Sequence, residues 1–255
     1  YTTLFRSVFF DHRVYKTYQR SRIARRQFDK PAAWFQRLPT RDLSGVPLDG
    51  VNSVDSWLSR LDEHGWMIGH STGTTGKLSF VPRSEAEWPA WQASYFSGLE
   101  ASIGWDPRQE AVHVISPLYR EGHQMMMKMQ SLFARVTAGG ESHRHVLYDY
   151  RISSDLLSLA ARLQLAQAKG EEDKLEIDPE MLRQHADLIA RNANKEADME
   201  AWLTTLVDEF RGQRVHVAGT GADLVRMAAM GRERGLKCEF AANWTMCTGG
   251  GMKGY

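Results

Sequence analysis

The sequence lacks the features that would place it in several protein classes. No stretch approaches the ~18 uninterrupted apolar residues of a membrane-spanning helix, and the mean hydropathy is −0.45. Its two cysteines, Cys238 and Cys247, are too few for a disulfide framework or a four-cysteine zinc site. No signal peptide opens the chain, so we expect a cytoplasmic protein. The 32 Lys and Arg nearly balance the 31 Asp and Glu, and the net charge of +1 gives no whole-chain reason to expect a nucleic acid or a membrane as partner.

Length and composition are those of an ordinary soluble globular protein. The 255 residues allow one large domain or two modest ones, with 42% hydrophobic and 25% charged residues. The chain begins at Tyr1 instead of a methionine and ends at Tyr255 directly after a glycine cluster. We therefore expect it to be part of a longer gene product.

The first 30 residues are strongly basic, with eight Lys and Arg against two Asp. Aromatic residues lie between the basic ones, and this combination is also found where proteins contact nucleic acids. The alternative is a helix that packs Leu4, Phe5, Val8 and Phe9 against the protein and turns its arginines to water. We favour the alternative, because nothing else in the chain indicates a nucleic-acid partner.

The order of the expected elements predicts an α/β fold with a mostly parallel sheet flanked by helices, since a strand, a helix and a second strand follow one another near the end of the chain. Residues 1–60 are expected to form a helical and loop-rich segment, irregular over 31–60, and residues 61–255 a nucleotide-binding core. Expected strands are 66–69, 78–81, 111–115 (closed by Pro117), 214–218 and 244–247. Expected helices follow a Ser84/Glu87 capping box up to Gly104, run from Ser153/Ser154 to Gly170 and from Pro179 to about Asn192, and span 199–210 and 222–234.

The sharpest motif lies between the first two expected strands and consists of Ser71, Thr72, Gly73, Thr74, Thr75, Gly76 and Lys77. Glycines let backbone N–H groups approach an anion, hydroxyls donate further hydrogen bonds, and the lysine adds a positive charge. This is the chemistry of a phosphate-binding loop. It is not a Walker A loop, because Ser71 stands where the first glycine is needed and Leu78 follows the lysine.

The seven residues instead resemble the phosphate-binding signature of adenylate-forming enzymes, which joins two strands as a hairpin. A second motif, Thr248 to Gly254, contains Gly249, Gly250 and Gly251 after the last expected strand. Together with Val215 to Gly221 it resembles the acyl-protein synthetases of bacterial bioluminescence, in which a triglycine precedes a tryptophan. Met252 replaces that tryptophan here. Phenylacetate-CoA ligases, which share the first motif, are the next most similar family.

The resemblance implies that ATP activates a fatty or aromatic carboxylic acid as an acyl-adenylate, with Mg²⁺, and that CoA or a protein thiol then accepts the acyl group. It assigns Thr72, Thr74, Thr75 and Lys77 to the β- and γ-phosphates and the glycines at 249–251 to the adenine. His123, in a segment that resembles the acyl-pocket strand end, would neutralise the carboxylate. Its alternative is an ordinary histidine of a surface loop. No residue is assigned to a metal, and a partner protein or a homodimer remains open.

Other residues carry weaker indications. Met125, Met126, Met127 and Met129 would line an apolar acid pocket, but methionines at this density more often fill a core. His143 and His145 would ligate a metal, but no third ligand has useful spacing, and a solvated loop is favoured. Cys247 adjoins the glycine run and would be an acyl acceptor, but a buried strand cysteine is favoured.

The family's later elements, a Thr-Glu segment, a ribose-binding aspartate and a mobile C-terminal domain with a catalytic lysine, are not found before Tyr255. We therefore expect either the incomplete N-terminal part of an adenylating enzyme, inactive by itself, or a degenerate, non-catalytic relative that acts as a partner subunit.

Overall fold

The structure, a computed structural model, describes residues 12–39, 41–71 and 77–249. The chain divides into two compact units. The first comprises residues 1–86 and 153–182, and the second comprises residues 87–152 and 183–255. The expected domain boundary at residue 60 falls inside helix α4 (Val54–Glu63).

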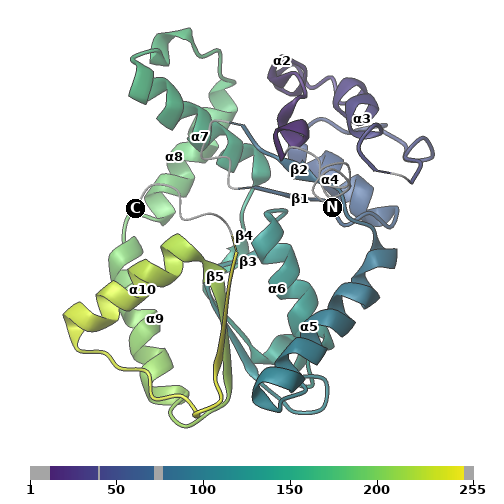
Figure 1. Cartoon of the computed structure of the whole chain (residues 1–255). Coiled ribbons are helices and arrows are strands. Elements are labelled where there is room, and N and C mark those ends of the chain that lie inside the picture. The colour runs from purple at the N-terminus through teal and green to yellow at the C-terminus, as the bar shows by residue number, and fades with distance from the viewer. Residues whose placement is uncertain (1–11, 40, 72–76, 250–255) are drawn as a thin grey trace, which may run out of the picture. The chain divides into compact units, whose positions relative to one another are not determined.

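The first unit is built from short helices and one hairpin (Figure 1). Its elements are η1 (His12–Lys16), α2 (Arg20–Ala24), α3 (Asp29–Phe35), α4 (Val54–Glu63), β1 (Gly69–His70), β2 (Phe80–Val81), α7 (Ser154–Lys169) and η4 (Glu172–Lys174). The 3-10 helix η2 (Glu85–Glu87) lies at its boundary, and α8 (Pro179–Arg191) begins in this unit and continues into the second.

The expectation that residues 31–60 are irregular is confirmed for 36–39 and 41–53, which form no helix or strand, and is wrong at both ends of the range, where α3 and α4 lie. Pro31 lies in the first turn of α3, where its missing N–H leaves no helical bond unmade. The α4 helix begins with a capping box in which Ser53 and Ser56 bond each other's backbone N–H groups. The prolines and glycines of this range favoured a loop, although Pro31 is compatible with the first turn of a helix and Ser53 with Ser56 forms a helix cap.

Aromatic side chains form the core of the first unit. Trp57, Phe35 and Phe80 are completely buried, and Trp57 meets Phe80 edge to face with ring centres 5.2 Å apart. Tyr18 packs against Trp34 and Phe80 at 5.1 and 5.2 Å. Aromatic contacts of this geometry add about 0.5–1.5 kcal/mol each beyond the burial of area. The core therefore fixes the N-terminal segment against the hairpin.

Helices α4 and α7, almost 100 residues apart in the chain, cap each other. The Asp55 carboxylate accepts hydrogen bonds from the Ser153 hydroxyl at 2.6 Å and from the Ser154 backbone N–H at 2.9 Å. In return, the Asp155 carboxylate accepts from the backbone N–H groups of Val54 and Asp55 at 2.9 and 3.0 Å. Each carboxylate thus satisfies donors that a helix N-terminus leaves unpaired.

The second unit carries a four-stranded parallel sheet in the order β4-β3-β5-β6. The strands are β3 (His113–Glu121), β4 (Arg144–Arg151), β5 (Val215–Thr220) and β6 (Thr245–Gly249). The helices are α5 (Trp88–Ile103), α6 (Met125–Val136), α9 (Lys195–Glu209) and α10 (Gly221–Arg234), with η3 (Gly140–His143) before β4. The expected α/β class with a parallel sheet flanked by helices is confirmed.

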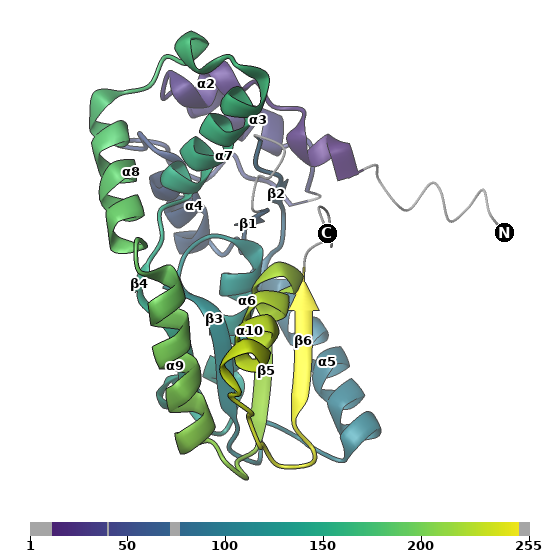
Figure 2. The ribbon, with the colours of Figure 1, turned by 90° about the vertical axis from the view of Figure 1, so that its left-hand side faces the viewer.

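Helices cover both faces of this sheet, α5 and α6 on one side and α9 and α10 on the other (Figures 1 and 2). Phe133 of α6 and Phe96 of α5 pack with Val114 on the first face, whereas Leu203 and Leu206 of α9 pack with Val217 on the second. In the order β4-β3-β5-β6, the chain passes from β3 to β4 on one side of β3, and then to β5 and β6 on the other side of β3. The topological switch point is therefore at the carboxyl ends of β3 and β5.

Several elements differ from expectation. The expected strands 66–69 and 78–81 are shorter, because β1 covers only Gly69–His70 and β2 only Phe80–Val81. The strand β3 continues through Pro117 to Glu121, because its pairing with β4 shifts register between Ser116 and Tyr119, so the proline's missing N–H is accommodated. Helix α5 starts at Trp88 without a side-chain cap, since Ser84 is held in a bridge with Trp66. Helix α9 begins at Lys195, four residues before the expected start.

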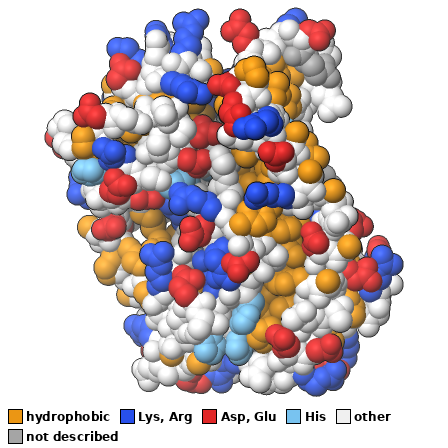
Figure 3. All heavy atoms as spheres, turned by 180° about the vertical axis from the view of Figure 1, so that it is seen from behind, with side chains coloured by type: hydrophobic (Ala, Val, Ile, Leu, Met, Phe, Trp, Pro, Cys, Tyr) orange, Lys and Arg blue, Asp and Glu red, His pale blue; other side chains and the backbone are white. Residues whose placement is uncertain are grey.

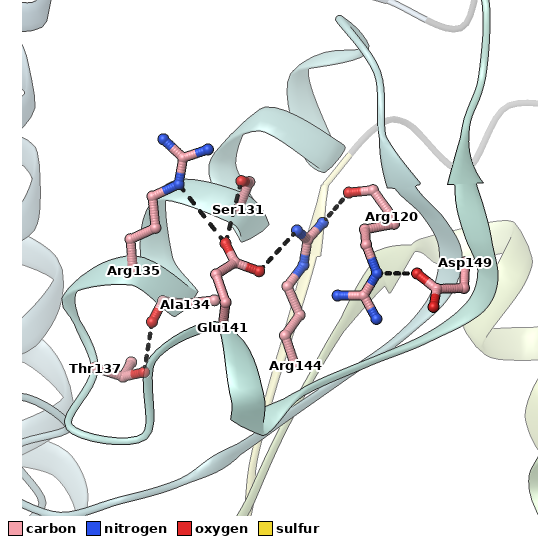
Figure 4. A network of polar contacts seen from close by, with 8 residues as sticks. All are labelled: Arg120, Ser131, Ala134, Arg135, Thr137, Glu141, Arg144 and Asp149. Carbon is pink, nitrogen blue, oxygen red and sulfur yellow. Dashed lines mark hydrogen bonds and ion pairs between the residues drawn. The ribbon is translucent and has the colours of Figure 1, made fainter.

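A buried arginine ties the sheet to the segment before β4 (Figure 4). The Arg144 side chain, 1% exposed, donates to Glu141 at 3.4 Å and to the backbone carbonyl of Arg120. Arg120 in turn pairs with Asp149. Burial lowers the pKa of Arg144 and the Glu141 carboxylate opposes that shift. The network fixes the position of β4 beside β3.

Within the described part of the chain, no helix has both the length and the apolar character that crossing a bilayer requires.

The shared capping of α4 and α7 predicts a specific pH dependence of stability. Burial, opposed by the two backbone hydrogen bonds, raises the pKa of Asp155 to about 6, and the neighbouring Asp55 raises it further. Because the folded pKa lies above that of a free aspartate, about 3.9, the folded state binds the proton more tightly, and stability is lost as pH rises from about 4 through 6. The difference in unfolding free energy between the wild type and Asp155→Asn should therefore fall over this window.

Urea unfolding at pH 4, 5, 6 and 7 measures that difference. Asp187→Asn, at an exposed position of α8, is the control and should show no such slope. A difference between wild type and Asp155→Asn that stays constant from pH 4 to 7 would contradict the interpretation.

Candidate functional site

The two ends of the expected phosphate-binding loop are held by an antiparallel hairpin in the first unit. Gly69 pairs with Val81 and His70 with Phe80. The Ser71 backbone N–H donates to the Ser79 carbonyl at 3.0 Å, and its hydroxyl oxygen accepts from the Ser79 N–H at 2.9 Å. The expected strand-loop-strand arrangement around Ser71 and Lys77 is therefore present. The other loop residues, Thr72, Gly73, Thr74, Thr75 and Gly76, lie outside the described residues.

Lys77 is half-buried and contacts Tyr18. Its ammonium donates to the Tyr18 backbone carbonyl and lies 4.4 Å from the centre of the Tyr18 ring. The Tyr18 hydroxyl donates to the Leu78 carbonyl at 3.0 Å. One tyrosine therefore bonds both the last residue of the loop, Lys77, and the residue after it. Burial, Arg20 and Lys16 all lower the pKa of Lys77. The lysine therefore lies in a positively charged environment, which favours the approach of an anion.

His70, which sequence reasoning overlooked, links the loop to helix α7. It is completely buried, and its Nδ1 lies 2.7 Å from the Ser71 carbonyl, which can only accept, so Nδ1 donates. In the neutral ring Nε2 then accepts from the Ser154 hydroxyl 3.0 Å away. Ser154 also donates its backbone N–H to Asp55. The only sequence signal was a histidine directly before the motif.

His123 is buried in the second unit instead of lying on a surface loop. Its Nε2 is 2.7 Å from the Arg151 guanidinium, which can only donate, so Nε2 accepts. His123 therefore lies just beyond the carboxyl end of β3 with its Nε2 engaged, and Arg151 is the nearby cation.

The start of the glycine run ends strand β6. Gly249 pairs with Thr220, the last residue of β5, and the Thr220 hydroxyl oxygen caps helix α10 by accepting from the Asp223 N–H at 3.3 Å. Gly249 and the N-terminus of α10 thus lie at the carboxyl edge of the parallel sheet, where α/β folds bind ligands. Gly250 and Gly251 lie outside the described residues.

Cys247 is partly exposed and interacts with buried polar groups. The pKa of Tyr95 is raised above its usual range, first by burial and then by its electrostatic interaction and hydrogen bond with Cys247. The Tyr95 hydroxyl lies 3.3 Å from Nε2 of His216, whose Nδ1 is 2.8 Å from the Thr245 hydroxyl. Burial lowers the pKa of His216 to about 4, so this histidine is neutral at pH 7.

His143 and His145 pack against a third histidine at the N-terminal edge of the sheet, instead of forming a solvated loop. His113 Nδ1 lies 3.0 Å from His145 Nε2, and the His113 and His143 rings stack at 4.7 Å. Figure 3 shows histidine side chains side by side on this face. Burial and the neighbouring histidines lower the pKa of His145 to about 4. Among the described residues, no three His, Cys, Asp or Glu side chains are arranged to hold a metal ion.

The four methionines of α6 differ in their burial. Met127 is buried, while Met125, Met126 and Met129 are partly exposed. Met127 also approaches Gly122, where an added Cβ would lie 3.1 Å from its sulfur and 2.9 Å from Ile152. Gly122 therefore permits the close approach of α6 to the end of β3.

Comparisons of the chain with protein-family models, with curated proteins and with solved structures found no match. The resemblance to adenylate-forming enzymes thus stays a prediction that depends on the two motifs.

The contact between His70 and Ser154 yields a prediction about stability. Replacing Ser154 by alanine removes the hydroxyl that bonds the completely buried His70 at Nε2, and the loss of this buried hydrogen bond should cost about 1–3 kcal/mol of unfolding free energy. Ser158→Ala, at a half-buried position of the same helix, is the matched control and should cost less. Urea unfolding measures both, and equal losses in the two variants would refute a special role for the contact.

Proposed function

We propose that this chain belongs to a protein of the adenylate-forming superfamily that uses ATP to activate a carboxylic acid as an acyl-adenylate and passes the acyl group to a thiol. Acyl-protein synthetases are the most similar family and phenylacetate-CoA ligases the next. The observation that carries the proposal is the full seven-residue motif from Ser71 to Lys77, with both ends held by an antiparallel hairpin. The protein would act in the cytoplasm, with CoA or a protein thiol as acceptor.

In the reaction proposed, a carboxylate oxygen attacks the α-phosphorus of ATP and pyrophosphate leaves. A thiolate then attacks the acyl carbon and AMP leaves. Negative charge grows on the departing pyrophosphate, so the role of Lys77 and of the hydroxyls and N–H groups at 71–76 is to stabilise that charge. Mg²⁺ bound with the nucleotide would neutralise further charge, and no residue of the chain is assigned to it.

The second unit supplies support of its own. The glycine run follows β6, and the helix α10 begins beside it after β5. Glycines at the carboxyl edge of a parallel sheet allow a planar ring such as adenine to approach the backbone closely. We assign Gly249, Gly250 and Gly251 to that ring. His123 follows strand β3, and Arg151 ends the neighbouring strand β4. Of the two, Arg151 is the better candidate to neutralise an acid's carboxylate.

One observation favours a second candidate function, a non-catalytic module that keeps the fold and binds nucleotide as a partner subunit. His123, expected to neutralise the carboxylate, is engaged as an acceptor by Arg151. Met252 also replaces the tryptophan of the synthetase motif. Such a module would bind ATP without forming an acyl-adenylate, so activity with an acid distinguishes the two candidates.

The test is ATP–pyrophosphate exchange with the protein as the cell makes it, screened over fatty and aromatic acids. The proposal predicts exchange that depends on one class of acid. Absence of exchange with every acid, in a protein shown to be folded, would refute it. ATP binding without any exchange would then favour the non-catalytic module.

Lys77 should contribute to nucleotide binding in either case. Lys77→Ala removes the charge beside the phosphates and should weaken ATP binding by about tenfold or more, because charged hydrogen bonds are worth about 1.5–3 kcal/mol. Lys30→Ala, at an exposed lysine of α3 paired with Asp29, is the control and should bind as the wild type does. Isothermal titration with ATP measures both, and an unchanged affinity of Lys77→Ala would show that the loop assignment is wrong.

A further inference from the structure

The place where helices α4 and α7 cap each other is connected to the hairpin by hydrogen bonds. This helix junction consists of Val54, Asp55, Ser154 and Asp155. Asp55 accepts from the Ser154 backbone N–H at 2.9 Å, and the Ser154 hydroxyl lies 3.0 Å from Nε2 of His70. Nδ1 of His70 lies 2.7 Å from the Ser71 carbonyl oxygen. Because Ser154 and His70 are completely buried, water does not compete for the bond that joins the junction to the hairpin.

Ser71, the first residue of the motif, holds the two strands of the hairpin together. Its N–H donates to the Ser79 carbonyl at 3.0 Å, and its hydroxyl oxygen accepts from the Ser79 N–H at 2.9 Å. Both bonds lie next to the pair formed by His70 and Phe80, at the end of the hairpin that faces the motif. A displacement of His70 moves the Ser71 carbonyl that it bonds. The amides of Ser71 and Ser79 therefore report how firmly the start of the motif is held.

The helix junction contains two acids whose simultaneous ionisation is costly. Burial raises the pKa of Asp155, the backbone N–H groups of Val54 and Asp55 oppose this, and the charge of Asp55 and its hydrogen bond with Asp155 raise the pKa further, to about 6. Within the described part of the chain, Asp55 is the charged group that acts on Asp155, and His70 is the titratable group on the hairpin side. Below this pH the pair carries one negative charge, and above it two charges that repel each other.

Other charged side chains of the two helices lie away from the pair. Asp62 of α4 and Arg162 of α7 each follow the acid of their own helix by seven residues, about 10 Å along the axis. Arg60 of α4 pairs with Glu63 at 3.2 Å. The charge at the junction therefore depends mainly on its own two carboxyl groups.

From these contacts we propose that Asp55 and Asp155 form a proton-operated switch for the hairpin. One proton shared by the two carboxyl groups keeps the helix junction closed, and its release loosens the hold of Ser154 on His70 and thereby on Ser71. The step breaks one O–H bond, the electron pair stays on the carboxylate, and the proton goes to water. The inference goes beyond the proposed function and does not need it, since the switch acts on the hairpin without a nucleotide.

The test is amide hydrogen exchange of the whole chain, followed by NMR without nucleotide at pH 5, 6 and 7. Each rate is compared with that of an unfolded peptide at the same pH, which gives a protection factor. With a pKa of about 6 in the closed junction and about 3.9 in an open one, protection of Val54, Ser71 and Ser79 should fall about tenfold from pH 5 to pH 7. The Gln36 amide, which donates to the Ala32 carbonyl in α3, is the internal reference and should not change.

Two variants separate the switch from the route that transmits it. Asp155→Asn keeps an oxygen that accepts hydrogen bonds but does not titrate, so protection of the junction and the hairpin should be constant from pH 5 to 7. Ser154→Ala removes the hydroxyl alone, so the Val54 amide should keep its pH dependence while Ser71 and Ser79 lose theirs. Asp187→Asn, at an exposed position of α8, is the matched control and should behave as the wild type does.

Four results would overturn the inference. Constant protection of Ser71 and Ser79 in the wild type would show that the hairpin does not sense the acids. The same pH dependence in Asp155→Asn would assign the titration to His70, and in Ser154→Ala it would exclude the route through the hydroxyl. An equal change at Gln36 would show unfolding of the whole unit instead of a local switch. Asp155→Asn decides the question by itself where Ser154→Ala is too unstable to measure.

Discussion

The first unit depends on the reciprocal capping of two helix N-termini. Asp55 and Asp155 each supply a carboxylate to the other's helix, and the contacts join residues about 100 positions apart. Two partial positive charges that face each other would repel, and the carboxylates remove that cost at the expense of holding two partly buried acids close together. Through this junction the start of α7 lies beside the hairpin, where the Ser154 hydroxyl bonds His70.

The hairpin therefore receives support from three directions that are separate in sequence. Tyr18 holds the strand after the loop, His70 holds the strand before it, and α7 contributes the residue that His70 contacts. A loop rich in glycine has much conformational freedom to lose when it binds a ligand, and fixed ends reduce that loss. The second unit follows a different principle, since its parallel sheet brings the ends of β3, β5 and β6 to one edge.

Much of the second unit could be predicted from the sequence, because local signals agree with the fold there. Gly104 and Gly235 end helices in the left-handed conformation, and the strand-helix-strand order of β5, α10 and β6 produces the parallel pairing. The first unit was less predictable. Its helix α4 begins at a Ser-x-x-Ser box among prolines and glycines. The ends of its loop depend on His70 and Tyr18, whose partners are set by long-range contacts with no local pattern.

The central claim is that the loop from Ser71 to Lys77, held at its ends by the hairpin, binds the phosphates of ATP. Amide hydrogen exchange followed by mass spectrometry, with and without ATP, tests this most directly, because a bound ligand slows local opening of the backbone that it contacts. The account predicts slower exchange over 71–79 and in the segment around Tyr18, which bonds both Lys77 and Leu78. Protection confined to other segments, or none at saturating ATP, would contradict it.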